Sequence, residues 1–392
     1  MILMKSIPWT AHQIDSFISE YRPYRMLLKL AARCNINCTY CYWFQDKDVY
    51  TRPKCLSEQA ELLLLARLDE YFEFSRPIRF LISFHGGEPL LFGKSRFKKL
   101  CYNLRQVAEM HHVDLRLSIQ TNGIMLDKEW ADIFMLFRVS VGISLDGLKV
   151  DNDHARLDFR GKSTYSSVVN GIRSAQEAGL DVGILAVWNP GSKPLEICQH
   201  FTNDLGITSI DFLMPDGTRD DAVDCSGMVK FYSEIFNIWY FSDVKDIDIR
   251  IAHNLLKLLF SNDGDTESLG YGPTTTFSIA TDGQYEVLDV LNVLKNGSTR
   301  TTASLQDTRI ADVNTIPGWK DQVRSSLSLS DTCVQCPYLR QCGGGYLPSR
   351  YSQTNGFSNP SRNCSELKLI FDHVQQTVLS DLKNLRMAKS SS

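Results

Sequence analysis

The chain of 392 residues is 43% hydrophobic and 22% charged, an ordinary globular composition that can supply a large core and two domains. Its net charge of −3 gives no electrostatic support for binding nucleic acid. No apolar run approaches the ~20 residues that cross a bilayer, and residues 1–16 lack the basic-then-apolar layout of a signal peptide. We therefore expect a cytoplasmic protein that binds neither nucleic acid nor a membrane.

The first part of the chain alternates strand and helix signals after a short lead-in over residues 1–24, where Ile14, Phe17 and Ile18 can form the apolar face of one or two helical turns. Repeated βα units predict a parallel sheet with right-handed crossovers. In such sheets the chemistry collects at the carboxyl ends of the strands. The predicted strands are 26–32, 79–84, 115–120, 139–145, 182–188 and 209–214, and the predicted helices are 58–74, 94–110, 128–137, 165–178 and 195–204.

The second part of the chain has a different character. Two helices are predicted over 228–240 and 248–260, and a polar, glycine-containing break follows over 261–272. From there short strands and turns dominate until a final helix over 367–387. We therefore expect a lead-in over 1–24, a βα-repeat domain over 25–225, connecting helices over 226–265, a cysteine-rich domain over 266–387 and a disordered tail over 388–392.

The eleven cysteines are unevenly distributed, and in a cytoplasmic chain they are more often ligands than disulfides. Cys34, Cys38 and Cys41 follow the first predicted strand with the spacing Cys-x3-Cys-x2-Cys. Three thiolates can hold a cubic iron–sulfur cluster, whereas four are needed to close a [4Fe–4S] site. One iron would stay open to a small molecule, as the open position of a catalytic zinc does. A structural zinc site is the alternative, but it would lack one ligand. Cys55, Cys101, Cys198 and Cys225 are scattered, and we interpret them as core or surface residues.

At this loop the sequence resembles the radical S-adenosylmethionine (SAM) enzymes. Their cysteine loop, placed after the first strand of a partial (β/α)6 barrel, matches Cys34, Cys38 and Cys41, with the aromatic Tyr40 before the last cysteine. The resemblance implies an α/β fold in which a partial (β/α)6 TIM barrel over 25–225 is followed by a small cysteine-rich α+β domain. It also implies that the open iron chelates SAM and that cleavage of SAM yields a 5′-deoxyadenosyl radical.

The stretch from His85 to Pro89, with Gly86, Gly87 and Glu88 between them, follows the second predicted strand. Two glycines let the backbone approach a ligand closely, and Glu88 offers an acceptor for an ammonium group. An ordinary turn is the alternative, but the resemblance implies that this motif binds the amino group of SAM.

Four further residues are implied as SAM contacts by the resemblance alone. Ser144 and Arg156 would contact the carboxylate and ribose region, and Asn122 and Val187 would line the ribose and adenine. Serine and asparagine at strand ends are also common turn residues, so both interpretations stay open.

The second cysteine group comprises Cys333, Cys336, Cys342 and Cys364. Four thiolates could close a structural zinc site, and spacing alone does not exclude a zinc ribbon. The pattern resembles the SPASM domain, which carries auxiliary clusters in peptide-modifying radical SAM enzymes. Tyr346 stands where the full domain has a further cysteine, and its upstream cysteine pair is absent. The resemblance therefore implies one auxiliary [4Fe–4S] cluster bound by these four cysteines.

The stretch 281–289 ends in Leu288 and Asp289, where full SPASM enzymes have a cysteine and an aspartate. A lone aspartate after a strand is usually solvated or caps a turn. Its register with the proposed base of sulfatase maturases implies that Asp289 takes a proton from the substrate.

The details of the motifs, over about residues 25–375, resemble the cyclophane-forming maturases of ribosomally made peptides. That resemblance implies removal of a β-carbon hydrogen from a precursor peptide, a carbon–carbon crosslink to an aromatic ring, and a reducing partner such as flavodoxin or ferredoxin. The alternatives are formylglycine formation as in anaerobic sulfatase maturases, thioether or ether crosslinking, and epimerisation. A metal-containing module that only binds peptides is the non-enzymatic alternative.

Overall fold

The computed structural model describes residues 8–222, 224–242, 247–261, 264, 266–295 and 297–390. The chain forms two compact units. We call residues 10–185 and 274–324 the barrel unit, and residues 1–9, 186–273 and 325–392 the cysteine-rich unit.

The barrel unit is built on a mostly parallel sheet in the order β12-β11-β10-β1-β3-β4-β5-β7. The pairs β1–β3, β3–β4, β4–β5, β5–β7 and β1–β10 are parallel, while β10–β11 and β11–β12 are antiparallel. The strands are β1 (Arg25–Ala31), β3 (Arg79–Gly86), β4 (Asp114–Thr121), β5 (Val139–Ser144), β7 (Val182–Val187), β10 (Ser278–Ile279), β11 (Gln284–Glu286) and β12 (Arg300–Ser304). This sheet confirms the expected α/β fold with a partial TIM barrel.

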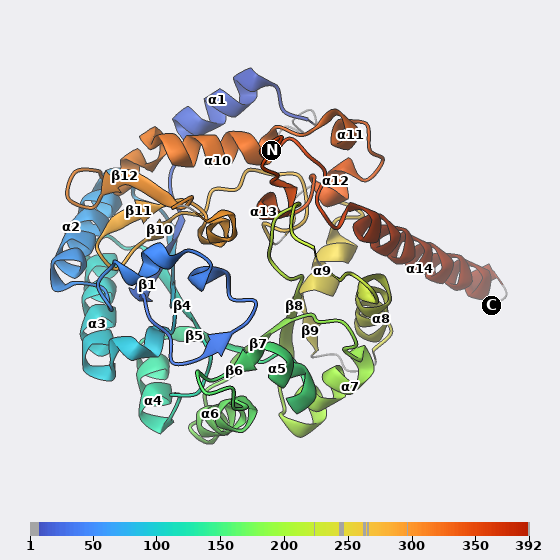
Figure 1. The fold of residues 1–392 in the computed structure, drawn as a ribbon, viewed down its shortest axis with the longest axis horizontal. Coiled ribbons are helices and arrows are strands. Elements are labelled where there is room, and N and C mark those ends of the chain that lie inside the picture. The colour runs from blue at the N-terminus through green and yellow to red at the C-terminus, as the bar shows by residue number, and fades with distance from the viewer. Residues whose placement is uncertain are drawn as a thin grey trace. The chain divides into compact units, whose positions relative to one another are not determined.

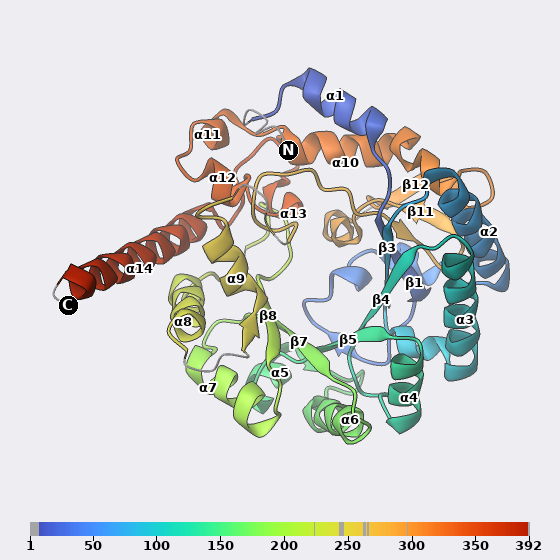
Figure 2. The same ribbon diagram turned by 180° about the vertical axis from the view of Figure 1, so that it is seen from behind.

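Helices α2 (Glu58–Ser75), α3 (Lys94–Met110), α4 (Lys128–Leu136) and α6 (Tyr165–Glu177) of this unit lie outside the strands (Figures 1 and 2). An aromatic cluster joins the sheet to two of them, because the Phe97 ring lies 5.0 Å from Phe84 of β3, 5.4 Å from Trp130 and 5.6 Å from Phe134. Burying each such ring contributes about 1.5–3 kcal/mol. The helices are α1 (Ala11–Glu20), α2 (Glu58–Ser75), α3 (Lys94–Met110), α4 (Lys128–Leu136), α5 (Lys149–Ala155), α6 (Tyr165–Glu177) and α10 (Pro317–Leu327).

The division into units differs from the expected domain boundaries. Residues 274–324, which were expected in the cysteine-rich domain, belong to the barrel unit. The reason is strand pairing, since Leu27 and Leu28 of β1 lie opposite Ser278 and Ile279 of β10. The lead-in is divided, because residues 10–24 belong to the barrel unit while residues 1–9 are assigned to the cysteine-rich unit. In the barrel unit the Tyr21 ring lies 4.7 Å from the ring of Trp319 in α10.

The cysteine-rich unit contains the parallel strand pair β8–β9 and several short helices. Ser209 and Ile210 of β8 lie opposite Asp248 and Ile249 of β9, so the predicted helix over 248–260 begins later, as α9. The elements of the cysteine-rich unit are β8 (Ser209–Leu213), α8 (Met228–Tyr240), β9 (Asp248–Ile249), α9 (Arg250–Lys257), α11 (Asp331–Val334), α12 (Leu339–Cys342), α13 (Leu347–Arg350) and α14 (Cys364–Ser390). The helix predicted over 195–204 is shorter in the structure: it is α7 (Pro194–Gln199), followed by a π-helical turn, His200–Asp204.

The last helix, α14, packs on α8 of the same unit. The Tyr240 hydroxyl donates to Asp381 over 3.1 Å, and Nε2 of His373 lies 2.9 Å from the side-chain oxygen of Asn237. The helix continues to Ser390, into the range expected to be a disordered tail, and residues 391 and 392 lie outside the described residues. Within the described part of the chain, no helix combines the length and the apolar character needed to cross a membrane.

Candidate active site

The loop with the first three cysteines follows β1 directly and is held in place by local pairing. Within it, β2 (Asn37–Cys38) pairs with β6 (Arg156–Leu157), so that Cys38 lies opposite Arg156. The Arg33 guanidinium donates to the carbonyls of Val49 and Tyr50, each over 2.8 Å. These contacts tie both ends of the loop to neighbouring backbone.

Cys34, Cys38 and Cys41 are free thiols, and their surroundings fit an iron–sulfur cluster. Burial raises the pKa of Cys34 to about 12 and that of Cys41 to about 11, so a metal centre has to stabilise the thiolates that ligation requires. Among the described residues, no three histidine, cysteine or acidic side chains are grouped as the ligands of a single metal ion. Each cysteine of a cubane binds a different iron, so a cluster suits this dispersed set of thiols better than one zinc ion.

The glycines after β3 pack against the cysteine loop itself. The Gly87 amide donates to the Ala31 carbonyl and the Glu88 amide to the Arg33 carbonyl, both over 2.8 Å. A Cβ on Gly86 would lie 2.2 Å from the Ala31 oxygen, and one on Gly87 would lie 2.3 Å from the Arg33 oxygen. The sequence interpretation assigned these glycines to the approach of a ligand, whereas the close neighbour in the structure is the backbone that carries the cysteines.

Glu88 is fully buried and joins the ends of β3 and β4. Its carboxylate accepts from the Thr121 hydroxyl over 2.7 Å, the Asn122 amide over 2.8 Å and the Leu90 amide over 2.9 Å. Burial raises the pKa of Glu88 against the opposing effect of these donors. The carboxylate therefore holds the site together, and its role toward an ammonium group stays a prediction.

Asn122 and Ser144 lie at the carboxyl ends of β4 and β5. The Asn122 side-chain amide donates to Asn35 over 2.7 Å and lies 3.7 Å from the Cys34 sulfur. The Ser144 hydroxyl accepts from Gln120 over 2.8 Å. Val187, the last residue of β7, is half-buried and falls in the cysteine-rich unit.

Tyr40 and Arg156 form a hydrogen-bonded group with Asp146, a residue that the sequence did not single out as part of the site. The Tyr40 hydroxyl donates to Asp146 over 2.8 Å and accepts from Arg156 over 2.7 Å. Burial opposes the charge of Arg156, but Tyr40, Cys38 and Asp146 hold its pKa well above its ordinary value. A permanent cation therefore lies beside the cysteine loop, where it can pair with an anionic ligand.

Asp289 lies in a buried polar cluster at the start of a 3-10 helix, η5 (Asp289–Leu294). Its Oδ2 forms an ion pair with the Lys29 ammonium, accepts from the Tyr42 hydroxyl over 2.8 Å and lies 3.7 Å from Nδ1 of His85. Burial alone would raise the pKa of Asp289, but the charge of Lys29 and the hydrogen bonds from Lys29 and Tyr42 hold it below its ordinary value. The carboxylate is thus held ionised.

Sequence reasoning missed Lys29, Tyr42 and His85 as members of this cluster. The signal was present, because Lys29 interrupts an otherwise apolar strand and buried lysines are rare unless paired. In the parallel register of β1 and β3, Lys29 lies opposite His85.

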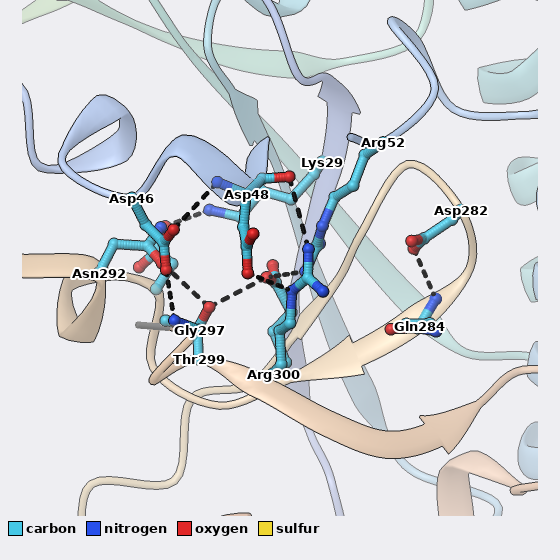
Figure 3. A network of polar contacts seen from close by, with 12 residues as sticks. Lys29, Asp46, Asp48, Arg52, Asp282, Gln284, Asn292, Gly297, Thr299 and Arg300 are labelled. Carbon is cyan, nitrogen blue, oxygen red and sulfur yellow. Dashed lines mark hydrogen bonds and ion pairs between the residues drawn. The ribbon is translucent and has the colours of Figure 1, made fainter. Parts of the chain in front are cut away.

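A second buried ion pair lies in the same unit, where Arg52 contacts Glu286 over 2.7 Å. Around it, polar contacts join the segment that follows the cysteine loop to the chain from η5 to β12. Asp46 accepts from the Gly297 amide over 2.5 Å, and Arg300 lies 3.2 Å from Asp48. Figure 3 shows these residues together with Lys29 and Arg52.

The second cysteine group is brought together within the cysteine-rich unit. Cys333, Cys336, Cys342 and Cys364 all line one pocket, whose wall also includes Leu367 and Phe371. After Cys342 the chain turns through three glycines with φ of +59°, +87° and +80°, a conformation that other residues rarely adopt. Burial raises the pKa of Cys342 to about 12, with Cys333 and Cys364 adding to the effect. Four soft ligands around one pocket fit the auxiliary cluster expected from the sequence.

Residues 28–199 match the family model of the radical SAM superfamily. The chain therefore contains a radical SAM domain, and this match confirms SAM and [4Fe–4S] clusters as the cofactors expected from the sequence.

Curated relatives extend the similarity beyond that domain. The cysteine-type anaerobic sulfatase-maturating enzyme of Clostridium perfringens (strain 13 / Type A) is 24% identical over 385 residues, which cover 93% of this chain and 100% of the relative. The serine-type anaerobic sulfatase-maturating enzyme of Bacteroides thetaiotaomicron is 32% identical over 181 residues, which cover 45% of this chain and 43% of the relative.

Solved structures show the same fold. "Native anSMEcpe with bound AdoMet and Cp18Cys peptide" has a TM-score of 0.80 at 21% identity and covers 93% of this chain and 99% of that one. "Crystal structure of Streptococcus suis SuiB" has a TM-score of 0.58 at 13% identity and covers 90% and 81%. At these identities the likeness shows a shared fold.

Proposed function

We propose that this protein is a radical SAM maturase that removes a hydrogen atom from the β-carbon of a residue in a peptide and then oxidises the resulting radical. The observation that carries this proposal is the ionised, buried carboxylate of Asp289 in the same compact unit as the cysteine loop. The match to the radical SAM superfamily and the sulfatase-maturating relatives support it.

When bound, SAM and the cluster at Cys34, Cys38 and Cys41 supply a 5′-deoxyadenosyl radical. The chain's own residues would orient these groups: Tyr40 and Arg156 beside the loop, and Asn122 close to the Cys34 sulfur. The cysteine loop is held against the end of β3 by the segment Gly86, Gly87 and Glu88. As SAM contacts, Glu88, Ser144 and Val187 are part of the proposal.

Oxidation of the peptide radical releases one electron and one proton. The proton goes to the Asp289 carboxylate, since a positioned base contributes to such a step when its ionised form is held in place. The electron needs a one-electron acceptor of the iron–sulfur class, and the group at Cys333, Cys336, Cys342 and Cys364 is the candidate.

The full-length relatives favour formylglycine as the product, formed from a cysteine or serine of the peptide. A three-residue cyclophane is the second candidate, and a feature of this chain favours it. Leu288 and Tyr346 replace two cysteines expected of a full SPASM domain, and residues 226–332 contain none, so one auxiliary ligand set is left. Both products require the same loss of one electron and one proton from a β-carbon radical or its ring adduct.

The test uses anaerobically reconstituted protein with SAM, a reductant such as flavodoxin, ferredoxin or dithionite, and two β-deuterated probes. One probe is a cysteine-containing sulfatase peptide, and the other is a short peptide with repeated aromatic-x-x triplets, the kind of sequence that a three-residue cyclophane requires. We expect deuterium in 5′-deoxyadenosine with one of them. An aldehyde that reacts with hydrazide identifies formylglycine, whereas loss of two hydrogen atoms without an aldehyde identifies a crosslink. Iron-loaded protein that does not cleave SAM reductively would overturn both.

A further inference from the structure

Lys29 is a fully buried lysine whose ammonium contacts two polar groups and the face of an aromatic ring. It forms an ion pair with Asp289, lies 3.3 Å from Nδ1 of His85 and lies over the Trp43 ring, 4.6 Å from its centroid. A buried cation costs several kcal/mol unless it is paired and hydrogen-bonded in this way. These contacts therefore hold the Lys29 ammonium in one arrangement.

This arrangement determines which nitrogen of His85 carries the proton. An ammonium only donates, so Nδ1 of His85 has to accept the hydrogen bond from Lys29. In a neutral imidazole the proton then lies on Nε2. Burial and the charge of Lys29 lower the pKa of His85 to about 4, against the opposing effect of Asp289, so the ring is neutral near pH 7.

The same lysine orients the carboxylate. Lys29, Tyr42 and His85 all lie against the same carboxylate oxygen of Asp289, Oδ2, so these contacts fix the orientation of the carboxylate. The groups that face this carboxylate come from β1 (Lys29), β3 (His85) and the 3-10 helix η1 (Tyr42–Phe44), which supplies Tyr42. Glu286 of β11 adds a second carboxyl group that interacts electrostatically with both Asp289 and Lys29.

We propose that Lys29 is a positioning residue that prepares one proton acceptor and one hydrogen-bond donor for the peptide: Asp289 as a carboxylate, and His85 as a neutral imidazole with its proton on Nε2. The inference rests on the proposed function, in which Asp289 receives the proton released when the peptide radical loses an electron to an iron–sulfur acceptor. His85 exchanges no proton in this step, and its Nε2–H donates to an oxygen of the peptide.

The first test needs only wild-type holoenzyme. Nitrogen NMR of protein labelled at its histidines distinguishes the two neutral tautomers, and a His85→Gln variant assigns the signal. We expect the proton on Nε2 and a neutral ring down to pH 5. A proton on Nδ1, or protonation of the ring near pH 6.5, would overturn the proposal whatever the peptide substrate is.

The second test compares Lys29→Met, which keeps the length of the side chain, with Lys29→Arg, which keeps the charge. We expect Lys29→Met to lower the yield of modified peptide per 5′-deoxyadenosine at least tenfold and to move the acidic limb of the yield-against-pH profile to higher pH, because Asp289 loses its cation. Lys29→Arg should keep that limb in place. An unchanged yield and profile in Lys29→Met would contradict the proposal.

Arg52→Met is the matched control, because it also removes the cation of a buried ion pair in the barrel unit but does not touch Asp289 or His85. We expect it to lower stability while leaving the His85 tautomer and the yield per 5′-deoxyadenosine unchanged. If Arg52→Met moves both readouts as far as Lys29→Met does, the effect is structural and the positioning role fails. Deuterium transfer into 5′-deoxyadenosine, measured in every variant, shows separately whether the proposed function stands.

Discussion

Several single residues of the barrel unit carry a charge whose burial has a large desolvation free energy. Lys29, Asp289, Arg52 and Glu286 are all nearly inaccessible, and removal of one partner from a buried ion pair typically costs about 3–5 kcal/mol. Hydrophobic residues of similar volume would often be as stable. A carboxylate kept ionised at the carboxyl ends of parallel strands is therefore better explained by chemistry than by stability.

Asp289→Asn removes the proposed base while keeping the shape of the side chain. We expect 5′-deoxyadenosine to form at close to the wild-type rate and the modified peptide to fall by about 10²- to 10⁴-fold, the usual contribution of a positioned base. Both products are measured in one assay by liquid chromatography with mass spectrometry. Equal losses of both would show that Asp289 acts before oxidation of the radical.

His85 gives the stability of the protein a pH dependence of known sign. Its pKa is lowered from 6.5 to about 4 in the folded protein, so the unfolded chain binds a proton first as the pH falls. The stabilisation is complete above pH 6.5 and is lost progressively below it. We expect the free energy of unfolding, measured anaerobically between pH 6.5 and 5, to fall less steeply in His85→Gln than in the wild type. Parallel slopes would show that His85 is not buried in its neutral form.

At the scale of elements, the cysteine loop depends on the end of β3. The Gly87 and Glu88 amides donate hydrogen bonds to the backbone of the loop. The loop backbone lies so close that neither Gly86 nor Gly87 could carry a side chain without displacing it. The Glu88 carboxylate ties the same segment to β4. The position of the three cysteines is therefore set by two neighbouring strands rather than by the loop alone.

Gly87→Ala should displace the loop, because its Cβ would lie 2.3 Å from the Arg33 oxygen and 2.5 Å from the Arg33 carbonyl carbon. We expect loss of the cluster at Cys34, Cys38 and Cys41, seen as a lower iron content and the absence of SAM cleavage. Gly272→Ala is the control, since a Cβ there meets nothing within 4 Å, and it should keep both. Full iron content in Gly87→Ala would contradict the packing role.

On the scale of the whole molecule, each cysteine group lies within one compact unit, the first in the barrel unit and the second in the cysteine-rich unit. All the cysteines of each ligand set therefore come from a single unit. The two clusters should therefore assemble independently, although oxidation of the substrate needs both.

The double variant Cys336→Ala/Cys364→Ala is expected to remove the auxiliary cluster and to leave the first one intact, because the two remaining thiolates are fewer than the three that hold the first cluster. Iron analysis and electron paramagnetic resonance should show about half the iron, with SAM cleavage retained and modified peptide strongly reduced. Cys34→Ala should give the reverse, with auxiliary iron retained and no SAM cleavage. Loss of all iron in the double variant would show that the two units do not load separately.

The sequence alone predicted the βα repeat and the two candidate sets of cysteine ligands, because these depend on local periodicity and on spacings within short segments, whereas Asp289 was singled out only by a resemblance to a family motif. Only the tertiary structure decided that residues 274–324 complete the barrel unit, since β10 pairs with β1 across a long separation in the chain. It also brought Lys29, His85 and Asp289 together. Lys29 and Asp289 are 260 positions apart, and local spacing carries no information about a contact made through the register of a sheet.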